Sequence, residues 1–256
     1  MSAPRTGRIN VISGHLTGDA ALDTAVSRAI LHRVGSGLLP ETIQVGTPHN
    51  VVAFGKHDTL ADHFPRAVSV AIDRGFDPTV RIAGGRAVVF HRGTVRFSWT
   101  TQASEPATTM HARFDQIANA VVDSLAALGV ETTVGELPGE YCAGSYSVHI
   151  VGGGKIMGVG QRLTRSAAQV GGVIVVDDTE SINAVLAPVY RALGVDMDPA
   201  RTGCVADAVP AAPSVVAASL VDRLSSGRDV SETTLDDETI ALASTYRADH
   251  VPTALA

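Results

Sequence analysis

The stretch Arg81-Ile-Ala-Gly-Gly-Arg-Ala-Val-Val-Phe-His91 combines strand-forming residues with a glycine pair and two arginines. Adjacent glycines, Gly84 and Gly85, let a backbone approach a ligand closely. Arg81 and Arg86 flank them, and arginine binds carboxylate or phosphate in a fork geometry. The stretch therefore suits an acyl phosphate, an adenylate or a phosphopantetheine arm. Taken alone, the glycines are more typical of a tight turn with solvent-facing arginines, because short glycine motifs often arise by chance.

Outward from this stretch, hydrophobic periodicity predicts a succession of helices and strands. Asp19 precedes the first helix as its N-cap, and Gly152-Gly153-Gly154 predicts a hairpin turn. The helical pattern covers 20–34, 61–74, 110–128 and 181–193. The strand pattern covers 8–13, 43–54, 79–90, 94–101, 146–151, 155–161 and 169–176, and Pro48 and Asn50 interrupt it within 43–54. This order favours an α/β (α+β) fold with a mixed, largely antiparallel sheet flanked by helices.

A change of composition after residue 199 predicts a boundary. Pro210 and Pro213 mark it, and two helical patterns follow at 215–224 and 233–246. We therefore expect one large domain over residues 1–209 and a short helical extension over 210–256 that packs on it.

Composition and charge exclude several classes of protein. The chain has 256 residues and a formal net charge of -6, and its basic residues are scattered, which argues against nucleic-acid binding. No apolar stretch approaches the roughly 20 residues that span a bilayer. The polar start, residues 1–7, lacks the apolar core of a signal peptide. Two cysteines make no disulfide framework, and no spacing matches a metal cage. We expect a cytoplasmic protein with no bound metal.

Three further residues could carry chemistry. Lys155 follows the glycine hairpin and could neutralise charge on an acyl oxygen or phosphate, or simply be solvated. Cys142 lies in a small-residue loop and could be an acyl nucleophile, although a lone cysteine is commonly a buried structural thiol. Cys204 is the competing candidate.

In this order, the segments resemble the lipoate–protein ligase, octanoyltransferase and biotin–protein ligase superfamily. Residues 81–91 are similar to its arginine, glycine, Ala-Val and histidine signature. Lys155-Ile-Met-Gly158-x-Gly-Gln161 resembles its lysine strand. The resemblance runs from about residue 9 to 205 and implies a class II aminoacyl-synthetase/biotin-ligase-like catalytic domain over 1–209.

The resemblance also implies roles for individual residues. Lys155 matches a lysine that contacts the acyl carbonyl or the adenylate phosphate. The residues that it places around the substrate are Arg81, Gly84, Gly85, Arg86, His91, Gly158 and Gln161. The Gly-Gly-Arg sequence and a cysteine thirteen residues before Lys155 look more like the cysteine-dependent octanoyltransferases, which favours Cys142 over Cys204 as nucleophile. Taken alone, His91 is typical of a structural histidine.

Three functions follow from the resemblance. The first is an acyltransferase that attaches an octanoyl or lipoyl group to a lysine of lipoyl-domain proteins through a Cys142 thioester, without a cofactor. Its partners would be glycine cleavage H protein, 2-oxoacid dehydrogenase E2 and acyl carrier protein. The second is a lipoate–protein ligase that uses ATP and Mg²⁺ to make lipoyl-adenylate. The third is a non-catalytic acyl-binding protein.

Overall fold

The computed structural model describes residues 7–14 and 17–253. Within them, eight strands form one sheet in the order β11-β1-β2-β6-β10-β9-β8-β7. Strand β1 runs parallel to both neighbours, and the remaining pairs are antiparallel. The strands are β1 (Arg8–Ser13), β2 (Glu41–Gly46), β6 (Thr94–Gln102), β7 (Thr132–Val134), β8 (Val148–Ile150), β9 (Lys155–Leu163), β10 (Ala167–Val175) and β11 (Asp229–Thr233).

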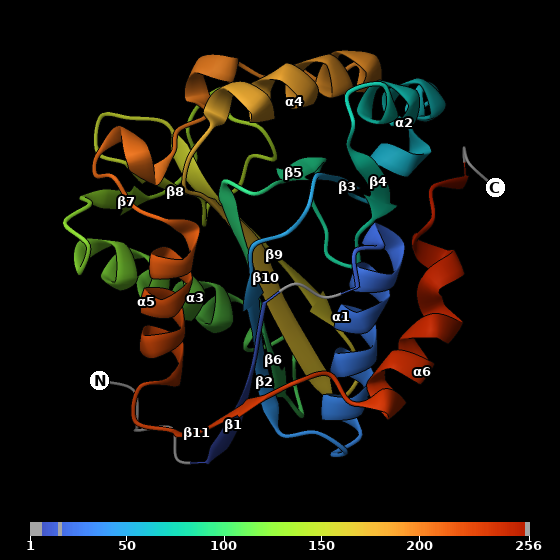
Figure 1. The fold of residues 1–256 in the computed structure, drawn as a ribbon, viewed down its shortest axis with the longest axis vertical. Helices are drawn as coiled ribbons and strands as arrows, with labels where there is room; N and C mark the ends of the chain where they lie inside the picture. Colours follow the sequence, from blue (N-terminus) through green and yellow to red (C-terminus); the bar gives the residue numbers. More distant parts are fainter. Residues whose placement is uncertain (1–6, 15–16, 254–256) are drawn as a thin grey trace.

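A second, three-stranded sheet has the order β4-β3-β5. Its strands are β3 (Val51–Phe54), β4 (Asp77–Val80) and β5 (Val88–Phe90). Two helices, α2 (Phe64–Ile72) and α4 (Thr179–Leu193), lie against this sheet at the top of Figure 1. Their apolar side chains and those of the small sheet form one continuous core.

The large sheet is covered by helices on both faces (Figure 1). Helices α3 (Met110–Ala126) and α5 (Pro213–Ser225) pack on one face, and α1 (Ala20–Gly35) packs on the other. Helix α6 (Asp237–Tyr246) packs against α1. Helix α1 begins where the sequence predicts, because the Asp19 carboxylate accepts a hydrogen bond from the Leu22 amide at 2.9 Å and satisfies a free helix-end donor. The mixed, largely antiparallel sheet flanked by helices is thus confirmed.

Two local predictions differ from the structure. The strand predicted over 79–90 is wrong in its middle, because β4 ends at Val80 and β5 begins at Val88. Residues 81–87 form a loop in which Gly85 has a φ of +93°, outside the range of a strand. The sequence pattern also missed β11, which pairs with β1 beyond the predicted boundary at residue 209.

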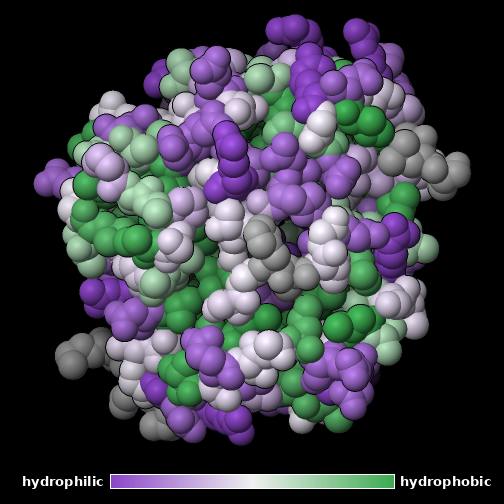
Figure 2. Space-filling view, in the orientation of Figure 1, coloured by the Kyte–Doolittle hydropathy of each residue, from purple (hydrophilic) through white to green (hydrophobic). Residues whose placement is uncertain are grey.

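The surface of the described part is varied. Figure 2 shows hydrophilic residues spread over one face, with smaller hydrophobic groups between them. No helix in residues 7–14 and 17–253 is long and apolar enough to cross a bilayer. The polar segment 1–6, which carries most of the argument against a signal peptide, lies outside the described residues.

Candidate active site

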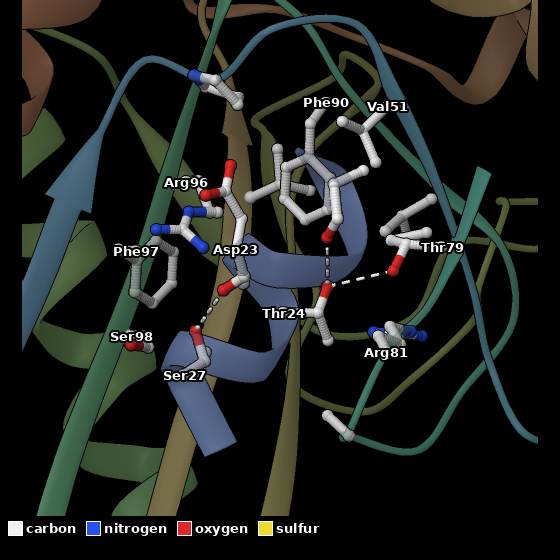
Figure 3. Close-up of a pocket in the computed structure, with 18 of the residues that line it drawn as sticks. Asp23, Thr24, Ser27, Val51, Thr79, Arg81, Phe90, Arg96, Phe97 and Ser98 are labelled. Atoms are coloured by element: carbon white, nitrogen blue, oxygen red, sulfur yellow. Dashed lines mark hydrogen bonds between the residues drawn. The ribbon is translucent and has the colours of Figure 1, made fainter. Parts of the chain in front are cut away.

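A cavity of about 210 Å³ lies between α1, the large sheet and the small sheet. Figure 3 shows Asp23, Thr24 and Ser27 of α1 on one side, with Arg96 and Ser98 of β6 facing them. Strands β3 and β5 contribute an apolar wall, which includes Val51, Ala53, Val88 and Phe90. Such a space, apolar with few polar groups, is typical of a small-molecule site.

Glycines on the central strands line this cavity. A Cβ on Gly172 of β10 would lie 2.2 Å from the Gly158 carbonyl oxygen on β9. Such an approach is far inside van der Waals contact, so these two strands can pair closely only with glycine at this position. Gly158, which the sequence predicts to be near the substrate, lines the cavity.

Cys142 lines the same cavity in a constrained conformation. Its φ is +43°, a left-handed conformation that a non-glycine residue keeps only when its surroundings hold it. Its amide donates to the Tyr190 hydroxyl at 2.7 Å, which in turn donates to the Ala87 carbonyl at 3.0 Å. Its carbonyl accepts a hydrogen bond from Lys155 at 2.9 Å. The two flanking peptide groups of Cys142 are therefore fixed.

The thiol of Cys142 faces donors from the residue 81–87 loop. The Arg86 amide donates to Sγ at 3.2 Å, and Nη2 of Arg81 lies 3.4 Å from it. The same Nη2 donates to the Arg86 carbonyl at 2.7 Å. A Cβ on Gly85 would lie 2.7 Å from Sγ and 2.5 Å from Arg81. Glycine at this position is what allows the arginines and the sulfur to meet.

Lys155 lies beneath the Cys142 loop and has no exposed surface. Its ammonium donates to Glu140 Oε1 at 3.2 Å and to the carbonyls of Tyr141 and Cys142 at 2.9 Å each. Burial lowers the pKa of Lys155, and the Glu140 carboxylate opposes this shift. Because three hydrogens are the whole donor capacity of an ammonium, the structure gives Lys155 contacts that hold the loop.

Glu140 organises the loop that carries Cys142. Besides Lys155, its Oε1 accepts from the Ser147 hydroxyl at 2.6 Å and the Gly144 amide at 3.1 Å. Its Oε2 accepts from the Leu137 amide at 3.2 Å. This buried carboxylate replaces the hydrogen bonds that a loop of this length would otherwise make to water.

Arg86 is held in place by a second buried carboxylate. Asp58 accepts from Nη1 of Arg86 at 3.3 Å and from the Gly55 amide at 2.9 Å, with no exposed side-chain surface. Burial raises the pKa of Asp58, and the hydrogen bonds from Gly55 and Arg86 oppose that shift. Gly84, in contrast, has open space where a side chain would begin.

Two predicted site residues, His91 and Gln161, lie away from this cluster. His91 is buried in the β5–β6 turn, where Nδ1 accepts from the Gly93 amide at 3.0 Å and burial lowers its pKa. Gln161 joins β9 to α3 through hydrogen bonds to Arg113 and the Met110 carbonyl. Neither residue lines the cavity.

Cys204 lies in a buried turn and donates to Asp207 at 3.2 Å. Burial and the Asp207 carboxylate raise the pKa of Cys204 to about 11. A thiol with this pKa is almost entirely protonated at neutral pH, so it is a poor nucleophile. The structure therefore separates the two cysteines that the sequence left as competitors.

Sequence reasoning missed the groups that support Cys142: Asp58, Glu140 and Tyr190. Glu140 lies in the same loop as Cys142, but the sequence of this loop has no hydrophobic pattern that would predict a buried carboxylate. No group of histidine, cysteine and acidic residues in the described ranges could hold a metal ion.

Comparison with known proteins identifies the family. The model of the lipoyl protein ligase A/B catalytic domain matches residues 19–215. The chain belongs to this family. The match takes in the residue 81–87 loop, Cys142, Lys155 and all of the cavity lining except Gly14 and Gly18.

Curated relatives in this family include two octanoyl-[GcvH]:protein N-octanoyltransferases. The one from Geobacillus kaustophilus is 28% identical over 176 residues, which cover 69% of this chain and 62% of the relative. The one from Anoxybacillus flavithermus is 28% identical over 152 residues, which cover 59% and 54%. The chain thus spans little more than half the length of these relatives.

Solved structures of the family share the fold. A proposed lipoate protein ligase from T. acidophilum with bound lipoic acid superposes with a TM-score of 0.77 at 20% identity, covering 96% of each chain. A lipoate-protein ligase A bound with ATP gives a TM-score of 0.75 at 21% identity, covering 95% of each chain. At these sequence identities the superpositions show that the chain shares the fold of these proteins.

Proposed function

We propose that this protein is an acyltransferase that carries an octanoyl group as a thioester on Cys142 and passes it to a lysine of a lipoyl domain. The observation that carries the proposal is the position of Sγ, at one end of an apolar cavity and within reach of the Arg81 and Arg86 donors. A nucleophile beside an acyl-sized space and a cluster of N–H groups is the arrangement that acyl transfer requires.

The size of the cavity supports an eight-carbon acyl group. A cavity of 150 Å³ in another protein binds benzene, which has six carbons. At the same packing, the volume of about 210 Å³ corresponds to about eight carbons. The lining is mostly apolar near the small sheet, as a hydrocarbon chain needs.

The proposed reaction has two steps. The Cys142 thiol attacks the acyl carbonyl of the donor, its proton passes to the leaving nitrogen or sulfur, and the donor is released as the amine or thiol. The lysine amine of the acceptor then attacks the thioester and restores the thiol. When Sγ becomes acylated, the Arg86 amide and the Arg81 guanidinium are the nearest donors for the carbonyl oxygen. In this proposal Lys155 positions Cys142 through its carbonyl instead of touching the acyl oxygen directly.

The relatives guide the choice of partners. Their name, octanoyl-[GcvH]:protein N-octanoyltransferase, describes a donor that is the octanoylated glycine cleavage H protein. We extend this donor to the present chain, with a lipoyl domain of 2-oxoacid dehydrogenase E2 as acceptor. Exchange of one acyl-lysine for another needs no nucleotide, because the bonds broken and formed are of the same kind. Acyl carrier protein remains an alternative donor.

Mass spectrometry of the intact enzyme tests this proposal. Incubation with octanoyl H protein and no acceptor should add one octanoyl group, which maps to Cys142 and is released by hydroxylamine. The adduct should be absent in Cys142→Ser and present in the matched control Cys204→Ser. An adduct on Cys204 would show that Cys204, and not Cys142, is the nucleophile. ATP consumption with lipoate and no adduct would establish the ligase instead, and binding without either reaction would leave an acyl-binding protein.

A further inference from the structure

The side of the cavity away from Arg81, the arginine that contacts Cys142, is polar and charged (Figure 3). Asp23 and Ser27 of α1 face Arg96 and Ser98 of β6 there (Figure 3). Both serine hydroxyls donate to Oε1 of the buried Gln44, at 3.3 Å and 3.1 Å. The apolar space that begins at Cys142 therefore ends at a wall of hydroxyl, amide and charged groups.

Strand pairing gives the length of the apolar space. Arg96 on β6 pairs with Val173 on β10, which pairs with Gly158 on β9. At the other end, a Cβ on Gly160 of β9 would lie 3.7 Å from the Arg81 guanidinium. The cavity thus crosses two strand spacings, about 9.5 Å, which is close to the length of an extended eight-carbon chain.

Arg96 forms no hydrogen bond or ion pair within residues 7–14 and 17–253, although the Asp23 charge acts on it. Burial lowers the pKa of Arg96. The carboxylate of Asp23 is engaged elsewhere, accepting from the amide and hydroxyl of Thr17 at 2.7 Å each. The side chain of Arg96 is only partly buried, so its free N–H groups can be hydrated, and covering them with an apolar chain is unfavourable.

We propose that Arg96 and Asp23 limit the length of the acyl group, so that a chain of eight carbons fits and a longer one is rejected. This inference rests on the proposed function of the cavity as an acyl site. A tail that extends beyond the eighth carbon would press methylene groups onto the guanidinium and displace its water. A shorter chain leaves apolar surface uncovered, so octanoyl is the chain that fills the space without reaching the charges.

The test compares acyl chains on three variants. The rate of Cys142 acylation is measured by mass spectrometry with octanoyl-, decanoyl- and dodecanoyl-pantetheine. In the unaltered protein, octanoyl should be favoured over dodecanoyl, which is four methylenes longer, by about tenfold or more, because a single methylene can already give about tenfold discrimination in a hydrophobic pocket. Arg96→Met, and the double variant Asp23→Asn/Arg96→Met that leaves no lone charge, should reduce this ratio to about one.

Arg92→Met is the matched control, because Arg92 is exposed in the neighbouring β5–β6 turn and does not line the cavity. It should leave the ratio unchanged. A ratio that is the same in the unaltered protein and in both Arg96 variants would overturn the inference. So would a preference of the unaltered protein for ω-carboxy or ω-hydroxy chains that disappears in Arg96→Met, since Arg96 would then bind a polar tail.

A readout without chemistry separates this inference from the proposed function. Binding of octanoate and dodecanoate is measured by calorimetry in the same proteins. If no thioester acylates Cys142, the proposed function is wrong. The length limit is then tested separately by the ratio of the binding constants for octanoate and dodecanoate. If acylation occurs and Arg96→Met changes neither ratio, only the length limit fails.

Discussion

Replacing Lys155 by methionine should destabilise the whole domain. The side chain has no exposed surface and is paired with Glu140, which is also buried. Removing one partner of a buried ion pair leaves the other charge without compensation, at a cost of about 3–5 kcal/mol. In a protein of this size each kcal/mol lowers the melting temperature by about 2–4 °C, so we expect a decrease of about 6–20 °C.

A second variant separates the charge from the packing. In Glu140→Gln/Lys155→Met neither partner is ionic, so part of the lost stability should return. The recovery should be incomplete, because Lys155 also binds the carbonyls of Tyr141 and Cys142, which the methionine cannot replace. Those acceptors would stay unsatisfied, at about 1–3 kcal/mol for each buried group.

Thermal unfolding followed by circular dichroism measures both variants, with acylation of Cys142 measured at a temperature where each is folded. Both should acylate slowly, because the left-handed conformation of Cys142 is no longer held. A normal melting temperature for Lys155→Met, together with complete loss of acylation, would refute this reasoning. That result would indicate instead that Lys155 contacts the acyl oxygen directly during the reaction.

Three further outcomes follow from the site. Gly85→Val should prevent acylation, because its Cβ would meet two side chains and its φ is +93°, whereas Gly84→Ala should acylate normally into open space; equal rates would contradict the geometry. Iodoacetamide at pH 8 should label Cys142 and spare Cys204, whose pKa is about 11, as peptide mapping can check. Urea unfolding should show lower stability below pH 6.5, because burial lowers the pKa of His91 in the folded state and the unfolded chain then binds the proton more readily; His91→Asn should weaken this dependence.

Local patterns in the sequence were sufficient for much of the fold. The helix after Asp19, the amphipathic helix beginning at Met110 and the hairpin before Lys155 depend on residues close together in the chain, so periodicity and capping predict them. The edge strand β11 was missed because its partner β1 is more than two hundred residues away. The sequence pattern placed Gly84 and Gly85 in a strand, but in the structure they lie in the residue 81–87 loop.

The sequence by itself determined the succession of elements, the family resemblance and the candidate residues Arg81, Cys142 and Lys155. Only the tertiary structure decided what these residues do, because their partners are brought together by strand pairing and by loops that cross. It placed Tyr190, 48 residues along the chain, on the Cys142 amide and turned the Lys155 ammonium toward Glu140 and the loop. Hydrogen bonds and burial depend on distances in space, and a single sequence encodes these distances only through the complete fold.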